Sequence, residues 1–180
     1  MRRLPQPVLD TIGTLARFGL AAVWLVSGGV KMSDPGQTYI AVQAYDVLPQ
    51  ALVRPVATGL PLLEIVLGVL LLVGLATRWV AAVSLVLLAV LIASIAQSWA
   101  RGLSIDCGCF GGGGRVAAGQ TEYPQEILRD TGFALLGIWL LVRPRTWLSL
   151  DRWLGWGQGK SIRDSAGVSA DRPGTNAEGN

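Results

Sequence analysis

The sequence contains no histidine, so the commonest metal ligand and the usual proton carrier at neutral pH are both missing. Haem bound through histidine is thereby excluded. Charged residues are also scarce, at 15% of the chain, whereas an average soluble domain has about 25%. The net charge of +3 comes from basic residues near the ends of apolar segments, which is typical of orientation in a membrane. We therefore expect contact with a lipid bilayer and no nucleic-acid partner.

Apolar sequence is abundant: 51% of the residues are hydrophobic, and the mean hydropathy is +0.47. A helix that crosses a bilayer needs about 20 residues. Four segments approach or reach that length: residues 12–30, 55–75, 79–99 and 124–142. The last is the weakest, because its uninterrupted apolar run begins only at Thr131. Since hydrocarbon leaves backbone groups no outside partner, we predict an all-α polytopic membrane four-helix bundle over residues 1–150.

Basic residues at the segment ends predict how the bundle is oriented. Six lie on one side: Arg2, Arg3, Arg78, Arg143, Arg145 and Arg152. Four lie on the other: Lys31, Arg54, Arg101 and Arg115. Positive residues favour the cytoplasmic side, so we expect both termini in the cytoplasm and the longer loops outside a bacterial plasma membrane. Residues 151–180 lack periodic apolar positions and predict a disordered cytoplasmic tail.

A cleaved signal peptide is the alternative interpretation of residues 12–30, because Arg2 and Arg3 resemble a basic leader. It is disfavoured for two reasons. The apolar stretch exceeds the 7–15 residues, roughly, of a signal-peptide core, and no A-x-A cleavage site follows it.

The two cysteines, Cys107 and Cys109, flank Gly108 in a glycine-rich loop between the third and fourth segments. On the outer face of a bacterial membrane such thiols meet oxidising conditions. A bridge between residues i and i+2 needs a tight turn, and strained or exposed disulfides are the labile ones. Gly108 and Gly111 provide a permissive backbone, so we expect a partner to approach the sulfurs closely. The pattern favours a redox centre.

Three other interpretations of the cysteine pair stay open. The first is a structural disulfide, but so short a loop constrains the unfolded chain little. The second is a pair of unpaired thiols. The third is a zinc site; it needs about four ligands, and we expect no metal because histidine is absent. Asp106 either disfavours a neighbouring thiolate or caps a turn. Arg101 and Arg115 would lower the thiol pKa if they fold back toward the sulfurs.

Four charged residues lie inside the predicted helices: Arg17, Glu64, Arg129 and Asp130. A charge in hydrocarbon is costly, so each should face the bundle interior with a partner. We expect Glu64 to pair with Arg17 or Arg129, either to fix helix packing or to form a proton or quinone site. Asp130 should need a partner of its own, because adjacent residues point to different helix faces. Lys31 is expected to extend toward the membrane surface.

Between the first two segments, residues 39–48 have apolar and aromatic residues at three- and four-residue spacing. This pattern predicts a short interfacial helix beside the cysteine loop. We expect it to act as a lid over the outer end of the bundle.

Taken together, the motifs resemble the MauE branch of the DoxX-like membrane proteins. The resemblance is carried by Arg17-Phe-Gly-Leu with Ser27-Gly-Gly-Val-Lys31, by Leu60-Pro-Leu-Leu-Glu64 with Gly68 and Gly74, by Asp106-Cys-Gly-Cys-Phe110-Gly111, and by Ile127-Leu-Arg129-Asp130. It covers roughly residues 12–142. The family implies a four-helix membrane bundle and a role in disulfide formation, or in maturation of a periplasmic methylamine dehydrogenase subunit. A thioredoxin-like partner would be expected.

The leading hypothesis is an integral membrane thiol-disulfide redox protein that supports the maturation of an exported protein. Cys107 and Cys109 would exchange electrons with a thioredoxin-like or exported thiol protein on the outer face, through a mixed disulfide. A quinone is the candidate electron carrier, and no other cofactor is indicated. The alternative is a non-enzymatic assembly or scaffold subunit of a membrane complex. The sequence leaves open the attacking cysteine, the direction of electron flow and the oligomeric state.

Overall fold

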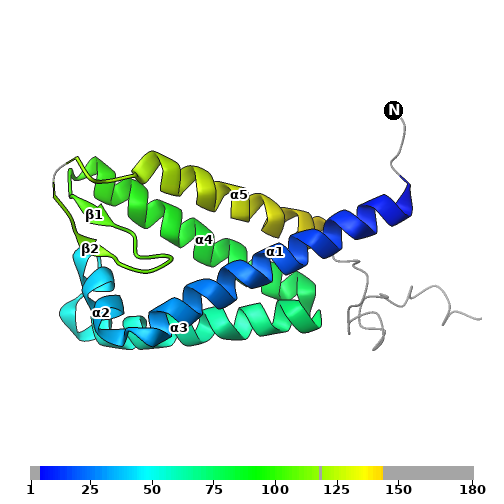
Figure 1. Ribbon diagram of the computed structural model, residues 1–180, viewed down its shortest axis with the longest axis horizontal. Coiled ribbons are helices and arrows are strands. Elements are labelled where there is room, and N and C mark those ends of the chain that lie inside the picture. Colours follow the sequence, from blue (N-terminus) through cyan, green and yellow to red (C-terminus); the bar gives the residue numbers. More distant parts are fainter. Residues whose placement is uncertain (1–4, 118, 144–180) are drawn as a thin grey trace, which may run out of the picture.

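The structure is a computed structural model that describes residues 5–117 and 119–143 (Figure 1). The predicted tail at residues 151–180 and the basic residues Arg2, Arg3, Arg145 and Arg152 lie outside the described residues. The elements are α1 (Gln6–Ser33), α2 (Pro35–Ala44), α3 (Gln50–Val73), α4 (Thr77–Ala100), β1 (Ile105–Asp106), β2 (Gly114–Arg115) and α5 (Tyr123–Val142).

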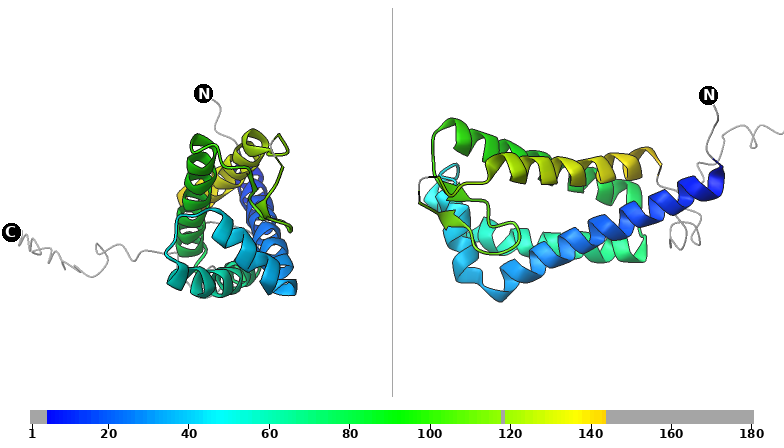
Figure 2. Two further views of the ribbon diagram at one scale, coloured as in Figure 1. Left: turned by 90° about the vertical axis from the view of Figure 1, so that its left-hand side faces the viewer. Right: turned by 45° about the horizontal axis from the view of Figure 1, so that its top comes forward.

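Four long helices, α1, α3, α4 and α5, form a bundle in which successive long helices run in opposite directions (Figures 1 and 2). The start of α1, the α3–α4 turn and the end of α5 lie at one end. The short helix α2 and the two strands lie at the other, which we call the loop end. The predicted four-helix architecture is therefore confirmed, and the two described ends of the chain lie on the same side of the bundle.

Helices α1, α3 and α4 are each long and apolar enough to cross a membrane. Helix α5 has 20 residues but begins with charged side chains, in line with its being the weakest of the predicted segments. Each predicted segment lies largely within a helix, although α3 begins at Gln50 rather than Pro55. The helix begins earlier because its first turn forms after Pro49, where the Leu52 backbone N–H donates to the Pro49 carbonyl at 2.8 Å.

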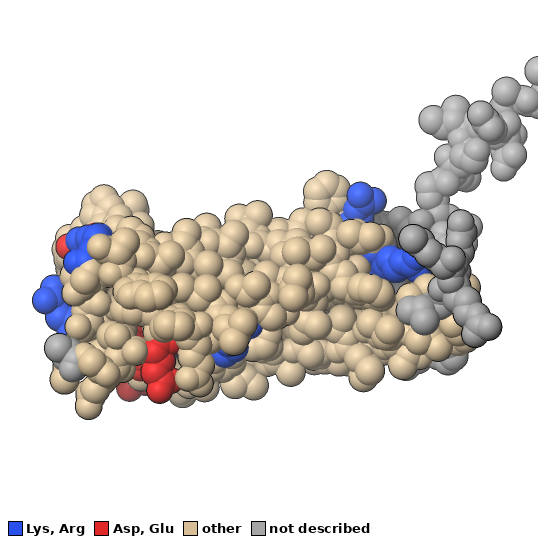
Figure 3. Space-filling model, turned by 90° about the horizontal axis from the view of Figure 1, so that it is seen from above, with Lys and Arg blue, Asp and Glu red and all other residues tan. Residues whose placement is uncertain are grey.

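The distribution of charged and apolar side chains on the described surface is also typical of membrane-spanning helices. On the face shown in Figure 3, most charged side chains lie toward the two ends, and one small basic patch lies near the middle. Large apolar side chains are exposed along the long helices, including Leu15, Val66, Val86 and Leu135. A soluble monomer rarely leaves so much apolar surface in contact with water, so these side chains are suited to lipid. The chain is a multi-pass helical membrane protein.

Helices α1 and α3 approach each other closely where each carries a glycine. A Cβ atom on Gly28 would lie 2.8 Å from Ile65 Cγ1 and 2.9 Å from the Pro61 carbonyl oxygen. A Cβ atom on Gly68 would lie 2.6 Å from Leu25 Cγ. Small residues allow helices to pack tightly in a membrane. The Gly28 contact lies toward the loop end, where both helices carry polar residues.

Two clusters of buried side chains fill the bundle. An apolar cluster contains Leu20, Leu71, Leu88 and Leu140 among others. The second cluster lies at the loop end and includes both cysteines together with Ile95, Ile105 and Tyr123. The cysteine loop is therefore part of the packed interior.

Candidate functional site

Residues 107–113 form a loop between the paired strands β1 and β2, in which Ile105 opposes Arg115 and Asp106 opposes Gly114. Gly108 and Gly113 have left-handed backbone conformations, with φ of 67° and 99°. The Cβ atom of Ala41, on α2, would lie 3.1 Å and 2.6 Å from Cβ atoms added at these two positions. Glycine is thus needed both for the turn and for the close contact with α2.

Helix α2 covers this loop, as predicted for the segment between the first two long helices. It spans Pro35–Ala44 rather than residues 39–48, because Asp34 caps its start by accepting a hydrogen bond from the Gln37 backbone N–H at 2.9 Å. The Gln37 side chain donates to the Gly113 carbonyl at 2.6 Å. The helix therefore holds the loop in place through both packing and hydrogen bonding.

Asp106 closes the loop. Its two carboxylate oxygens accept hydrogen bonds from the backbone N–H groups of Gly108 at 3.1 Å and Gly113 at 3.3 Å. Of the two interpretations of Asp106, the structure thus shows the turn-capping one.

The sulfur atoms of Cys107 and Cys109 lie 2.8 Å apart, and both cysteines are free. They are only 8% and 5% exposed. The expectation that a partner approaches the sulfurs directly is therefore wrong for this conformation. The loop turns inward beneath α2 instead of projecting from the bundle, and Tyr45 donates a hydrogen bond to the Cys107 carbonyl at 3.3 Å.

Cys109 is held from the side of α1 and α3 by Ser27, Lys31 and Glu64, which we call the α1–α3 group. The Ser27 hydroxyl donates to the Cys109 carbonyl at 2.8 Å and accepts from Lys31 Nζ at 2.7 Å. Lys31 Nζ also lies 2.6 Å from Glu64 Oε1. Ser27 Oγ lies 3.1 Å from Glu64 Oε2.

The predicted partners of Glu64 are therefore wrong: it pairs with Lys31 rather than Arg17 or Arg129. Side chains on a helix lean toward its N-terminus, so Lys31, near the end of α1, turns back into the bundle instead of extending outward. Arg17 lies 14 positions earlier, or about 21 Å along the helix. It is fully buried, and its guanidinium carbon lies 4.9 Å from the centre of the Phe18 ring.

Cys107 is held from the other side by Glu126, Arg129 and Asp130, which we call the α5 group. Glu126 Oε1 accepts a hydrogen bond from the Cys107 backbone N–H at 3.3 Å. Arg129 Nη2 lies 3.6 Å from Cys107 Sγ, and Arg129 Nε donates to Asp130 Oδ1 at 3.1 Å. Arg129 and Asp130 are thus partners despite being adjacent, because the long arginine stem turns its guanidinium toward the Asp130 face.

Sequence reasoning missed Glu126. A signal was present, because Glu126 lies four positions before Asp130 and such residues share a helix face. Arg101 and Arg115, proposed as cations near the thiols, do not act on the sulfurs. Arg101 pairs with Asp46 at 3.1 Å, and Arg115 is exposed on β2. Arg129 supplies the cation instead.

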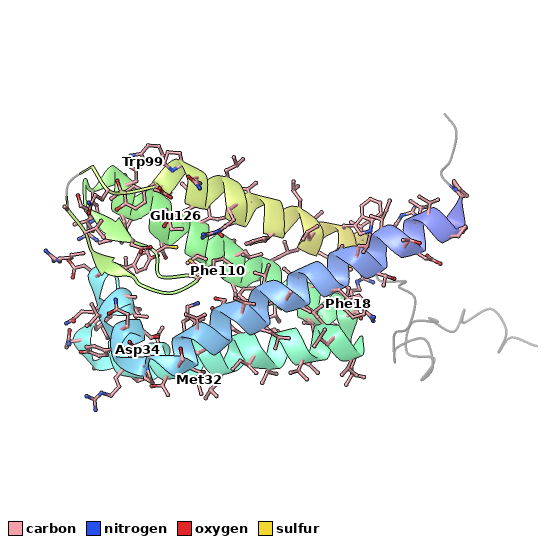
Figure 4. All side chains as sticks on the ribbon, in the orientation of Figure 1. Phe18, Met32, Asp34, Trp99, Phe110 and Glu126 are labelled. Atoms are coloured by element: carbon pink, nitrogen blue, oxygen red, sulfur yellow. The ribbon has the colours of Figure 1, made fainter. Side chains whose placement is uncertain are left out.

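Phe110 follows the cysteines and covers the α5 group. Its ring centre lies 4.9 Å from the Arg129 guanidinium carbon and 6.3 Å from the Phe133 ring centre. Figure 4 shows Phe110 and Glu126 together at the loop end, with Phe18 far along the bundle. The next residue, Gly111, has φ of 105°, so it continues the turn of the loop.

The contacts around the sulfurs set their ionisation. A hydrogen bond from the Cys109 thiol lowers the pKa of Cys107; burial opposes this shift, and Arg129 adds to it. The same hydrogen bond raises the pKa of Cys109, as does burial. Burial also raises the pKa of Tyr45, and the nearby sulfurs add to that shift. Of the three groups, Cys107 is therefore the one that ionises most readily.

Three residues place metal-binding atoms near one another: ligand atoms of Asp106, Cys107 and Glu126 lie within 4.8 Å. The Arg129 guanidinium contacts the same sulfur, and its positive charge opposes a metal cation at this position. A hollow of about 490 Å³ between α2, the α2–α3 loop and β2 is lined by Asp46, Leu48 and Arg115 among others. It does not include the cysteines.

No curated protein and no solved structure matches the chain. A sequence model of the family described as methylamine utilisation protein MauE matches residues 9–143, which include all five described helices except the first residues of α1. The chain therefore belongs to the MauE family of methylamine utilisation membrane proteins.

Proposed function

We propose that the protein is a thiol-disulfide redox protein of the bacterial plasma membrane that serves an exported protein of methylamine utilisation. The observation that carries the proposal is the environment of Cys107. Its sulfur lies 2.8 Å from a thiol donor and 3.6 Å from a guanidinium, and its pKa is lowered mainly by the Cys109 hydrogen bond. A thiol that ionises readily, held beside a second thiol, is the arrangement that disulfide exchange requires.

In the oxidising direction, a thiolate of the exported partner attacks Cys107 Sγ of the bonded pair, and Cys109 leaves and takes up a proton. The second partner thiolate then attacks the partner sulfur of the mixed disulfide. Cys107 leaves as a thiolate, and the partner gains a disulfide. A thiol of low pKa leaves faster, so the lowered pKa of Cys107 supports this second step. The reduced pair passes its two electrons to a quinone or to a thioredoxin-like protein.

Because both sulfurs are buried, the partner reaches them only when the loop moves. The loop has glycine at 108 and at 111–114, each with positive φ. Glycine lowers the energy needed for the backbone to change conformation, so the segment is suited to opening. The charge pattern of the loops supports placing this end of the bundle on the outer face.

The proposal is tested by trapping the mixed disulfide in intact cells. With Cys109→Ser, the Cys107 thiolate can still attack a disulfide of the exported partner, but this protein has no second thiol to release that partner. An adduct with an exported protein should therefore accumulate on non-reducing gels. With Cys107→Ser, or with both substitutions, the adduct should be absent. If the double variant supports growth on methylamine normally, the protein is a scaffold and the redox proposal is wrong.

Membrane orientation is tested separately in the double Cys→Ser variant. A single cysteine at the exposed position Arg115→Cys, on β2, should react with a membrane-impermeant thiol reagent applied to cells. The matched control, Arg78→Cys at the opposite end of the bundle, should react only after the membrane is permeabilised. The reverse pattern would place the cysteine loop in the cytoplasm and exclude exported partners.

The scaffold alternative has one observation in its favour. The loop is held by hydrogen bonds from both sides and from α2, as expected of a rigid structural element. It does not account for Arg129 at the Cys107 sulfur, since a loop without thiolate chemistry needs no cation there.

A further inference from the structure

Glu126 is held beside the thiol pair with one oxygen unused. The residue is only 8% exposed, and its Oε1 accepts from the Cys107 backbone N–H. Its Oε2 has no hydrogen-bond partner among the residues that the structure describes. A carboxylate oxygen of Glu126 lies within 4.8 Å of Cys107 Sγ. Buried polar atoms are normally bonded, so an open carboxylate oxygen at a reactive sulfur requires an explanation.

We propose that Glu126 is the proton acceptor and donor for Cys107 during disulfide exchange. The inference rests on the proposed function and adds a named residue to its mechanism. A separation of up to 4.8 Å is bridged by one water molecule or by a small side-chain rotation, which is sufficient for proton transfer.

The step balances without an additional reactant. When the reduced protein meets a partner disulfide, the Cys107 thiol gives its proton to Glu126 and becomes a thiolate. The thiolate forms a bond with one partner sulfur, and the partner S–S bond breaks. The leaving sulfur takes the electron pair of that bond and the proton from Glu126. Cys107 and one partner sulfur now form a mixed disulfide, the other partner sulfur is a thiol, and Glu126 returns to its charged form. Cys109 then attacks Cys107 Sγ and forms the disulfide of the pair, and the Cys109 proton passes to the second partner sulfur as it leaves.

This role resolves an electrostatic conflict at the site. The Cys109 hydrogen bond lowers the pKa of Cys107, whereas burial and the negative charge of Glu126 raise it. Once Glu126 has accepted the proton it is neutral, and the repulsion that it exerts on the new thiolate disappears. A carboxylate that stayed charged would only oppose the reaction.

The other ionisable groups around Cys107 are less suited to the role. Both carboxylate oxygens of Asp106 accept hydrogen bonds from backbone N–H groups, and the Tyr45 hydroxyl donates to the Cys107 carbonyl. Arg129 is a permanent cation. On the far side, Lys31 and Glu64 pair with each other. Asp130 pairs with Arg129 through Oδ1, but its Oδ2 has no partner in the described part of the chain, so it is the competing candidate.

The test uses the full-length protein in lipid nanodiscs, with glutathione disulfide as the oxidant. In Glu126→Gln the amide oxygen still accepts from the Cys107 N–H, so the loop should keep its conformation. We expect exchange to slow by about 10²-fold, the usual contribution of general acid–base catalysis. Glu126→Asp should restore part of the rate. Glu122→Gln, an exposed change just before α5, should react as the unsubstituted protein does.

The sign of the effect separates proton transfer from a purely electrostatic role. If Glu126 acted only through its charge, Glu126→Gln would favour the Cys107 thiolate and speed up exchange. Faster or unchanged exchange therefore overturns the inference.

Time-resolved infrared spectra of the reduced protein mixed with glutathione disulfide give a second readout. The C=O stretch of a protonated carboxyl should appear transiently during exchange and should be absent from Glu126→Gln. If the band persists there and disappears in Asp130→Asn, the proton acceptor is Asp130 and the inference is wrong. Neither result alters the proposed function, because adduct trapping with Cys109→Ser depends only on sulfur exchange.

Discussion

The cysteine loop is held from two sides, and the two sides use charge differently. In the α1–α3 group the single cation and the single carboxylate pair with each other, and the contact with the loop is a neutral hydroxyl on the Cys109 carbonyl. In the α5 group the cation reaches the Cys107 sulfur itself. One of its two carboxylates, Glu126, has an oxygen within 4.8 Å of that sulfur, and its Oε2 has no hydrogen-bond partner among the residues that the structure describes.

The difference assigns separate tasks to the two sides. A paired, internally balanced group fixes the backbone of Cys109 and has little influence on the Cys107 sulfur. A group with an excess of carboxylates and a cation at the sulfur controls ionisation and proton movement. Changes in the α1–α3 group should therefore alter stability more than thiol reactivity, and changes in the α5 group should do the reverse.

The largest effect is expected for Lys31→Met. Glu64 would then remain buried without a cation, and breaking a buried ion pair in this way lowers the free energy of unfolding by about 3–5 kcal/mol. Unfolding in detergent titrated with SDS would measure this. The double variant Lys31→Met/Glu64→Leu should recover most of the loss. If the single variant is no less stable than the double, the pair does not anchor the loop end.

The next effect concerns the contact between α1 and α3. In Gly28→Ala the new Cβ would lie 2.9 Å from the Pro61 carbonyl oxygen, a backbone atom that moves only if the helices separate. We expect a loss of about 1–3 kcal/mol in the same unfolding assay. Gly29→Ala is the matched control, because no atom lies within 4 Å of its added Cβ. Equal stability of the two variants would mean that the helices are not closely packed there.

The four-helix fold could be predicted from the sequence because hydrocarbon dictates helices from apolar length alone. The partners of the charges could not be predicted, because pairing depends on side-chain direction and on the depth to which the loop enters the bundle. Lys31 lies near a helix end, which suggested exposure, yet its stem turns inward to Glu64. Glu126 was missed because it lies before the apolar run of α5. The contacts of Lys31 and Glu126 depend on the cysteine loop folding inward, which the sequence does not predict.

The pH dependence of thiol alkylation reports on the α5 side of the loop. The alkylation rate of a thiol follows its thiolate fraction, so it rises with pH and reaches half its maximum at the pKa. Because the Cys109 hydrogen bond lowers the pKa of Cys107, the midpoint of the folded protein should lie at a lower pH than the midpoint of the SDS-unfolded protein. The unfolded midpoint is expected at about pH 8.5. Cys109→Ala should move the midpoint upward. Lys31→Met should leave the midpoint unchanged. If Lys31→Met shifts the midpoint as far as Cys109→Ala does, the two sides do not have separate tasks.

The smallest effect is expected at Phe110, the one loop side chain that packs on the α5 group from outside. Its ring contacts the Arg129 guanidinium and lies edge-on to Phe133, and a partly exposed cation–π contact contributes about 0.5–1 kcal/mol. Phe110→Leu should ease opening of the loop and speed alkylation of Cys107 at fixed pH by about two- to fivefold, the equivalent of that energy. Phe133→Leu removes only the second ring and should have less effect. An unchanged rate in Phe110→Leu would mean that α2, packed on Gly108 and Gly113, is what keeps the sulfurs buried.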